Sequence, residues 1–352
     1  MTTPGSSRPR AFAACVVASL ALCGAGFAQS RALSVDESVK VDGETKMVID
    51  GALKYLAGKQ HLDGSWSVKE GVGSHPVAIT GYTVLAFMAT GNLPDEGPYA
   101  KNVSAGMQFL LDSIQPDGTF RNVAPGQYMY NHGIATVALA ELYGESRSAA
   151  IRPKLEQLVA VILKAQDPAG GWRYTPQPRD ADLSVTVMQT VALRAAQDAG
   201  LAIPQQSIDK AVEYVKSCYQ PAKKGFSYQP GAPPGASRTA AAIYSLQVLG
   251  KYDDPSVKAG SDYLFTNLKD HGWWTYGNYY AAPAQYMIGG ETWRKWYGQV
   301  NQALLRAVHR EGGMAYWDPP IDGSQGVGSV FATAVYVHIL AMPYHFLPLY
   351  QR

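Results

Sequence analysis

Cysteine and charge are both scarce in this chain. It has three cysteines, and only 16% of its 352 residues are charged. Cys15 and Cys23 lie in the first 28 residues, so removal of an N-terminal leader would leave Cys218 with no partner for an intramolecular disulfide. A disulfide-rich scaffold is therefore excluded. The 47% of hydrophobic residues must stabilise the fold by forming a core.

Long apolar runs are absent except at the N-terminus. Residues 11–28 read AFAACVVASLALCGAGFA and follow Arg8 and Arg10, which is the pattern of a secretory signal peptide. We therefore predict a signal peptide over residues 1–28 and an exported protein, periplasmic or extracellular. A retained membrane anchor is the alternative, because the run is near the shortest length that spans a bilayer.

Net charge is also missing once that segment is set aside. Of 30 basic and 28 acidic side chains, Arg8 and Arg10 lie in the predicted signal peptide, which leaves equal numbers of the two signs. A chain without net charge does not attract nucleic acid by long-range electrostatics, so we expect no nucleic-acid partner. No glycine-rich phosphate loop is present, and the histidines form no ligand pair at helical spacing. We expect neither a cofactor nor a metal.

Glycine turns, by contrast, recur along the whole chain. Their glycines are Gly64, Gly118, Gly171, Gly225, Gly272 and Gly313. Intervals of 41 to 54 residues between these positions indicate a repeat architecture with six units.

Each unit combines two kinds of helix. Before the turn lies an amphipathic helix, such as residues 152–166, and after it lies a helix that is apolar nearly all round, such as residues 182–196 or 330–341. A helix without a polar face is buried on most of its sides. The sequence therefore predicts an all-α fold of six helical hairpins, with apolar helices in an inner ring and amphipathic helices in an outer ring. In the fifth unit we expect Pro283 to break the inner helix.

The turns resemble those of a known family. A glutamine, a short gap and then Gly-x-aromatic is the repeat of prenyltransferases and squalene cyclases. It is carried here by Gln60, Gly64 and Trp66, by Gln115, Gly118 and Phe120, and by Gln166, Gly170 and Trp172. The resemblance covers residues 40 to 345 and is closest to bacterial squalene-hopene-cyclase-like repeat proteins. It implies an α/α toroid over residues 45–345, between a linker at 29–44 and a tail at 346–352.

The resemblance also implies an acid. Every turn leads into an inner helix, so all inner helices should begin at one rim of the barrel. Asp180 and Asp182 match the first two aspartates of the Asp-x-Asp-Asp-Thr signature of squalene-hopene-type cyclases, whose middle aspartate protonates an alkene. Leu183 replaces the third aspartate and Ser184 the threonine. The implied catalytic set is Asp182 as acid, with Asp180 and His132 tuning it.

The same residues also fit a purely structural role. Asp180 follows a proline-rich loop and precedes a helix, where a side-chain oxygen caps free backbone amides. Asp182 would then lie in the first turn, where the helix dipole favours a carboxylate and lowers its pKa. His132 could simply hydrogen-bond the rim. We therefore expect the two aspartates to be ionised capping residues unless water is excluded from the site.

Aromatic and polar residues gather at the predicted rim and form the candidate substrate-binding set. Its members are Tyr130, Trp172, Tyr174, Arg238, Trp274, Tyr279, Tyr280 and Gln285. Arg238 is expected to bind an anionic ligand group or, as we slightly favour, to pair with Asp180 or Asp182 across the mouth. The aromatic rings either pack or stabilise a carbocation.

Two functions stay open. The first is an exported terpene-cyclase-like enzyme that cyclises a squalene-type polyisoprenoid with Asp182 as acid. The second is a non-catalytic toroid that binds a lipid, a glycan or a partner protein at the same rim. The Asp-x-Cys zinc pair of protein prenyltransferases is absent, because Lys216 and Ser217 precede Cys218. The expected partner is a hydrophobic or isoprenoid small molecule, with peripheral membrane association left open.

Overall fold

The computed structural model describes residues 39–68, 75–121, 123–267, 273–318, 328–347 and 349, so the predicted signal peptide lies outside the described residues. Within these ranges the chain forms twelve α-helices and two short antiparallel hairpins. The helices are α1 (Gly43–Gly58), α2 (Pro76–Met88), α3 (Ala100–Ser113), α4 (Tyr128–Ser146), α5 (Ile151–Lys164), α6 (Leu183–Asp198), α7 (Gln205–Ser217), α8 (Ala236–Val248), α9 (Pro255–Asn267), α10 (Trp274–Ile288), α11 (Gly290–Ala307) and α12 (Gly328–Ala341). The hairpins pair β1 (Tyr219–Gln220) with β2 (Gly225–Phe226), and β3 (His309–Glu311) with β4 (Met314–Tyr316).

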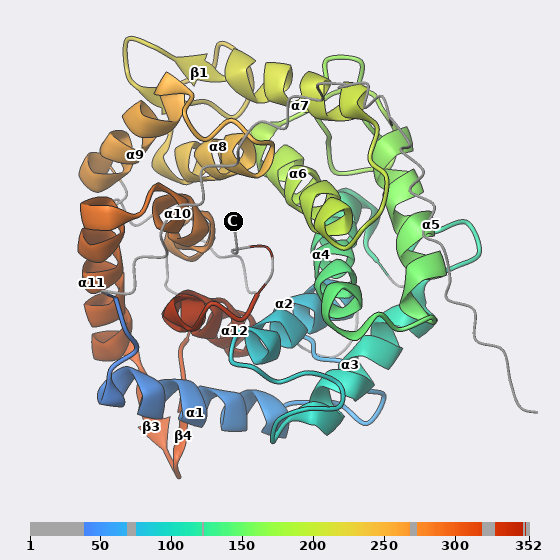
Figure 1. Cartoon of the computed structure of the whole chain (residues 1–352), viewed down its shortest axis with the longest axis vertical. Helices are drawn as coiled ribbons and strands as arrows, with labels where there is room; N and C mark the ends of the chain where they lie inside the picture. The colour runs from blue at the N-terminus through green and yellow to red at the C-terminus, as the bar shows by residue number, and fades with distance from the viewer. Residues whose placement is uncertain are drawn as a thin grey trace, which may run out of the picture. The chain divides into compact units, whose positions relative to one another are not determined.

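The helices form two concentric rings (Figure 1). The even-numbered helices make the inner ring, in which α2, α4, α6, α8, α10 and α12 contact one another in sequence and α12 closes on α2. The odd-numbered helices surround them. This is the predicted α/α toroid of six helical hairpins, and it is confirmed.

The burial of side chains explains which helix goes where. In α12 every residue from Ala332 to Ala341 is buried, as its continuous apolar sequence requires. In α7 the buried residues, among them Ile208, Val212 and Val215, recur at helical spacing on one face. The outer helices therefore turn a single apolar face to the ring, whereas the inner helices are covered on most sides.

The glycine turns pack tightly against the outer helix of the next hairpin. Gly64, Gly118 and Gly170 all have a positive φ, and a Cβ at Gly170 would lie 2.1 Å from the carbonyl oxygen of Lys210 in the following outer helix. In the third and fourth units the left-handed residues are Gly170 and Lys224, one position before the glycines from which the repeat was counted.

Gly170→Ala is expected to lower the free energy of unfolding by about 1–3 kcal/mol, because alanine disfavours the left-handed backbone and its Cβ has no space. Urea unfolding followed by circular dichroism measures the change. Gly231→Ala is the matched control, because Gly231 also has a positive φ but no atom lies within 4 Å of its added Cβ. Equal losses in the two variants would contradict the role of close packing.

The other residues of the repeat motif hold the same turn. Gln166 Nε2 donates to the carbonyl oxygens of Gly170 and Ser207, both at 2.9 Å, and so ties the turn to the next outer helix. Trp172 Nε1 donates to the Ile162 carbonyl at 2.7 Å, and its backbone amide donates to Thr186 Oγ1 at 3.0 Å. Trp66 makes the equivalent bonds in the first unit. These bonds of Gln166, Trp172 and Thr186 hold the turn in place, and we call them the turn clamp.

The predicted break at Pro283 is wrong. Pro283 lies inside α10, which runs without a break from Trp274 to Ile288, since ring packing on both sides tolerates the missing amide. Within the predicted tail from 346, Leu347 and Leu349 are buried, at 2% and 5% exposed.

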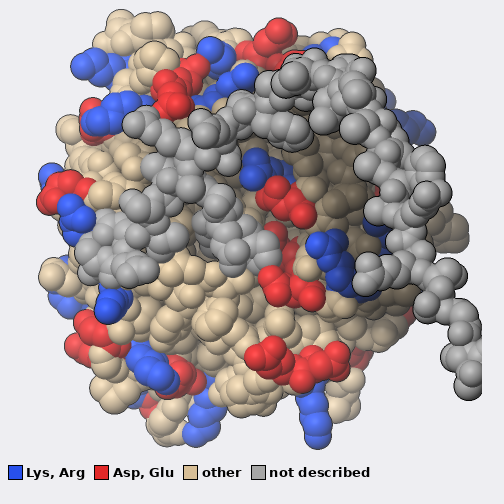
Figure 2. Space-filling model, in the orientation of Figure 1, with Lys and Arg blue, Asp and Glu red and all other residues tan. Residues whose placement is uncertain are grey.

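The surface is mixed in charge. Figure 2 shows acidic and basic side chains interspersed over the face of the molecule seen in Figure 1. Among the helices that the structure describes, none has the length and apolar character needed to cross a membrane.

Candidate functional site

Asp182 lies where the third glycine turn meets α6. An isolated bridge pairs Trp172 with Asp182, whose amide donates to the Trp172 carbonyl at 3.0 Å. Asp182 is the N-cap of α6, because its Oδ1 accepts from the amide of Val185 at 3.0 Å. The cap was expected at Asp180, which instead lies outside the helix and is exposed.

The Asp182 carboxyl is fully buried. Its Oδ1 also accepts from Ser184 Oγ at 2.5 Å. Its Oδ2 lies 3.3 Å from Arg173 Nε but has no partner of hydrogen-bonding geometry among the described residues. One oxygen therefore caps the helix, and the other forms an ion pair with Arg173.

Burial raises the pKa of Asp182 above its ordinary value, against hydrogen bonds from Ser184 and Val185, the positive charge of Arg173 and the nearby Tyr228 hydroxyl. Desolvation thus outweighs the helix terminus, which alone would favour the ionised form. The side chain is a cap and also a carboxyl that holds its proton more tightly than an exposed aspartate.

The cation of this site is Arg173, which the sequence analysis missed. Its Nη1 lies 3.2 Å from Asp180 Oδ2, so Arg173 joins both aspartates. The expected pairing with Arg238 is wrong. The Arg238 guanidinium folds back over the start of its own helix, where a Cβ at Gly235 would meet it at 2.4 Å.

Tyrosine hydroxyls surround the acid. Tyr130 hydrogen-bonds Ser184 Oγ at 2.6 Å, and Tyr276 donates to the Ser184 carbonyl at 3.4 Å. The hydroxyls of Tyr174 and Tyr228 contact each other, and Arg173 lies over both rings. Tyr228 was missed, although it follows its turn aromatic by two residues, as Tyr174 follows Trp172.

A band of aromatic side chains continues from the acid along the inner ring. The ring of Tyr82 meets those of Tyr279 and Phe331 edge-on, with ring centroids 5.2 and 5.0 Å apart. Tyr276 meets Tyr280 in the same way, with ring centroids 4.8 Å apart. Tyr82, Tyr276, Tyr279 and Phe331 are only partly buried. Each of these four side chains therefore keeps some accessible surface.

Tyr280 adjoins this band through Tyr276 and Tyr279, and Trp274 packs on α12. Tyr280 is 1% exposed and packs against Tyr244, whereas Trp274 is partly buried and meets Tyr336 edge-on at 5.7 Å. Of the predicted substrate-binding residues, Tyr130, Tyr174 and Tyr279 lie together with the acid or the aromatic band.

The side chains of Trp172, Gln285 and His132 do not contact the Asp182 carboxyl. Trp172 is fully buried in the turn clamp. Gln285 is fully buried and accepts from Ser261 Oγ of α9 at 2.7 Å, so it faces the outer ring. His132 lies 3.0 Å from the Leu158 carbonyl of α5, and burial lowers its pKa to about 4. His132 precedes Thr186 by 54 residues, which is about one repeat. In the second unit it therefore takes the place of the threonine that accepts from the amide of the turn tryptophan in the first and third units.

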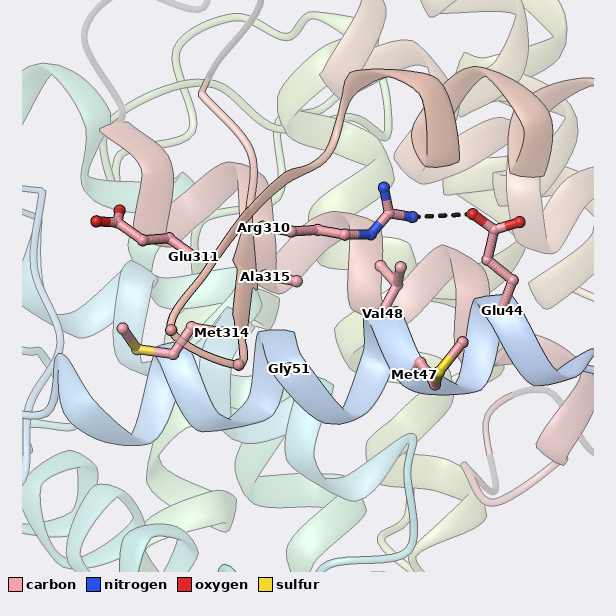
Figure 3. Close-up of a pocket in the computed structure, with 10 residues that line it drawn as sticks. Glu44, Met47, Val48, Gly51, Arg310, Glu311, Met314 and Ala315 are labelled. Carbon is pink, nitrogen blue, oxygen red and sulfur yellow. Dashed lines mark hydrogen bonds and ion pairs between the residues drawn. The ribbon is translucent and has the colours of Figure 1, made fainter.

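A surface groove of about 560 Å³ lies elsewhere, between α1 and the β3–β4 hairpin (Figure 3). All its lining residues come from these outer elements, and an ion pair between Arg310 and Glu44 crosses it at 3.0 Å. It offers no buried acid and no nucleophile. In the described part of the chain, no three His, Cys, Asp or Glu side chains gather so that they could hold a metal.

Solved structures of several activities have this fold. The type II terpene cyclase MstE from Scytonema is 16% identical, with 86% of this chain and 99% of that chain covered and a TM-score of 0.57. A cellobiose 2-epimerase from Bacillus thermoamylovorans is 12% identical over 87% and 99% of the two chains, with a TM-score of 0.65. An α-1,6-mannanase from Salegentibacter is 7% identical over 86% and 99%, with a TM-score of 0.62. At these identities the likeness concerns the fold alone.

Sequence comparison gives the family. No curated protein matches the chain. The model of the prenyltransferase alpha-alpha toroid domain matches residues 78–276, which is more than half of the chain and includes Arg173, Asp180 and Asp182. The chain therefore belongs to the prenyltransferase alpha-alpha toroid family.

Proposed function

We propose that this protein is a terpene-cyclase-like isomerase that starts the cyclisation of a polyisoprenoid by protonating a carbon–carbon double bond. Asp182 is the acid. The observation that carries the proposal is a fully buried carboxyl whose pKa is raised and whose Oδ2, 3.3 Å from Arg173 Nε, has no partner of hydrogen-bonding geometry among the described residues.

The reaction is balanced without a co-reactant. The proton on Asp182 adds to one alkene carbon, and the π electrons of a second double bond attack the cation formed at the other, which closes a ring. Loss of a proton from a neighbouring carbon ends the sequence, and a second proton transfer restores Asp182. The product is an isomer of the substrate.

The surroundings of Asp182 suit this chemistry in two ways. Ser184 and Val185 hold Oδ1, so the proton belongs on Oδ2. The rings of Tyr82, Tyr276 and Tyr279 offer π faces that attract a developing cation. A type II terpene cyclase of the same fold has been solved with geranylgeranyl dihydroxybenzoate, its substrate, which makes a long isoprenoid the first ligand class to test.

A second function is favoured by Leu183 and Arg173. Leu183 is fully buried where cyclases have a further aspartate, so Asp182 lacks a second carboxyl beside it. Arg173 stabilises the ionised form of Asp182. These features fit a non-catalytic toroid that binds an apolar ligand at the same rim.

Incubation of the full chain with squalene, and separately with a geranylgeranylated phenol, tests the two functions. Gas or liquid chromatography with mass spectrometry should show a new compound of unchanged mass. Recovery of substrate bound to the protein but never converted would support the binding function and reject the enzyme.

Arg173→Gln is expected to move the high-pH limb of the activity profile to higher pH. The acid works only when protonated, so the rate falls as pH rises through the pKa of Asp182, and the positive charge of Arg173 lowers that pKa. Arg152→Gln is the matched control, because Arg152 forms an exposed ion pair with Glu156 on α5. A limb that stays in place in both variants would show that Asp182 does not set it.

A further inference from the structure

A short chain of hydrogen bonds connects the Asp182 carboxyl to Tyr130. Tyr130 Oη lies 2.6 Å from Ser184 Oγ, and Ser184 Oγ donates to Asp182 Oδ1 at 2.5 Å. Because the hydroxyl proton of Ser184 is used in the bond to Asp182, the Tyr130 hydroxyl is the donor in its bond to Ser184. Both hydrogen bonds therefore run in the same direction, from Tyr130 to the carboxyl.

Tyr130 and Ser184 lie inside the ring of inner helices. Tyr276 of α10 donates to the Ser184 carbonyl of α6 at 3.4 Å, although α8 lies between these two helices in the inner ring (Figure 1). A contact between helices that are not neighbours in the ring passes through its interior. On α4, Tyr130 stands two residues before His132, which points outward to α5, so the two side chains leave the helix about 200° apart. The Tyr130 hydroxyl therefore faces the interior.

The other groups beside the carboxyl are poor sources of a proton. Val185 offers a backbone amide to Oδ1, and Arg173 lies 3.3 Å from Oδ2 with a guanidinium that is not deprotonated in proteins. Tyr228 is nearby, but Oδ2 has no partner of hydrogen-bonding geometry among the described residues. Within the described part of the chain, Ser184 is thus the hydroxyl that is hydrogen-bonded to Asp182.

We propose that Tyr130 takes the proton that is lost at the end of the cyclisation, and that Ser184 passes a proton on to Asp182, so that the acid is reloaded from inside the barrel. This inference rests on the reaction proposed for Asp182. It makes Tyr130 a further catalytic residue, because its hydroxyl oxygen receives a proton from the reacting cation. Ser184 is a positioning residue that acts through Tyr130.

Three proton transfers balance the step. A C–H bond next to the final cation breaks, its electrons form the new double bond, and its proton goes to Tyr130 Oη. The Tyr130 hydroxyl gives its own proton to Ser184 Oγ, and the Ser184 hydroxyl gives its proton to Asp182 Oδ1. Both hydroxyls keep one proton, and the carboxylate becomes a carboxylic acid. Half a turn about the Cβ–Cγ bond of Asp182 exchanges its two oxygens and brings the proton to the position of Oδ2.

The three transfers are coupled, because Tyr130 holds its proton tightly. Burial raises the pKa of Tyr130 despite the hydrogen bond with Ser184, so a phenolate does not persist at this position. Tyr130 releases its proton only as it gains another. The reloading of Asp182 is therefore tied to the completion of the product.

A rapid-quench time course of the full chain with an excess of geranylgeranylated phenol tests this relay. Wild-type product should accumulate linearly. In Tyr130→Phe the first proton transfer is retained, because Asp182 starts protonated, so about one product per chain should form before the rate falls by about a hundredfold or more. Ser184→Ala should give the same burst, and Ser184→Thr, which restores the hydroxyl, should be linear. A merely structural loss would lower the burst and the later rate together.

Tyr143→Phe is the matched control, because the Tyr143 hydroxyl, also on α4, accepts from Arg152 of the outer helix α5 at 3.2 Å. Its time course should stay linear. Linear product formation by Tyr130→Phe at the wild-type rate would overturn the relay and leave the cyclisation standing. A burst in Tyr228→Phe and none in Tyr130→Phe would also overturn it, because the acid would then be reloaded through Tyr228. No product from the wild-type chain would reject the cyclisation, and the relay with it.

Discussion

Asp182→Asn is expected to lower the rate of cyclisation by about a thousandfold or more, which is the usual contribution of a general acid. Asparagine keeps an oxygen for the Val185 amide and for Ser184, so the helix cap survives. Its amide is too weak an acid to protonate an alkene. The loss should therefore concern turnover and not folding.

The stability of the Asp182→Asn variant distinguishes a catalytic role of Asp182 from a purely structural one. The free energy of unfolding of Asp182→Asn should stay within about 1 kcal/mol of wild type, because asparagine caps as well as aspartate. Asp180→Asn is the control, since Asp180 contacts the same arginine but is 55% exposed. An Asp182→Asn variant as active as Asp180→Asn would reduce Asp182 to a cap.

Trp172→Ala is expected to lower the free energy of unfolding by about 3–5 kcal/mol. The indole is fully buried, and its removal leaves a cavity and deprives the Ile162 carbonyl of its donor. Urea unfolding measures the loss. Trp273→Ala is the matched control, because Trp273 is 49% exposed and its truncation should cost under about 1 kcal/mol.

Equal losses in the two tryptophan variants would contradict the turn clamp.

The double ring could be predicted because its signal is repeated. One Gln-Gly-Trp turn would have meant little, but the same turn in successive units fixes the order of outer and inner helices. The position of Asp182 at the start of an inner helix followed from that order. Its raised pKa did not, because burial is a property of the packed ring and not of the local sequence.

The sequence did not predict whether an individual side chain of an inner helix points to the barrel axis or to the outer ring. An inner helix that is apolar all round has almost no hydrophobic direction, so its sequence does not tell which residues meet the axis and which meet the outer ring. His132 and Gln285 were placed at the mouth for this reason, and both point outward. Arg173 was missed because its contacts depend on the bridge between Trp172 and Asp182, which joins residues ten apart.

Cyclisation in heavy water tests most directly whether Asp182 delivers a proton to carbon. The Asp182 carboxyl exchanges with solvent, so the first product of the wild-type chain should carry one deuterium bound to carbon and Asp182→Asn should give none. Mass spectrometry of the purified product measures it. A cyclised product without carbon-bound deuterium, or the same labelled product from Asp182→Asn, would contradict the account.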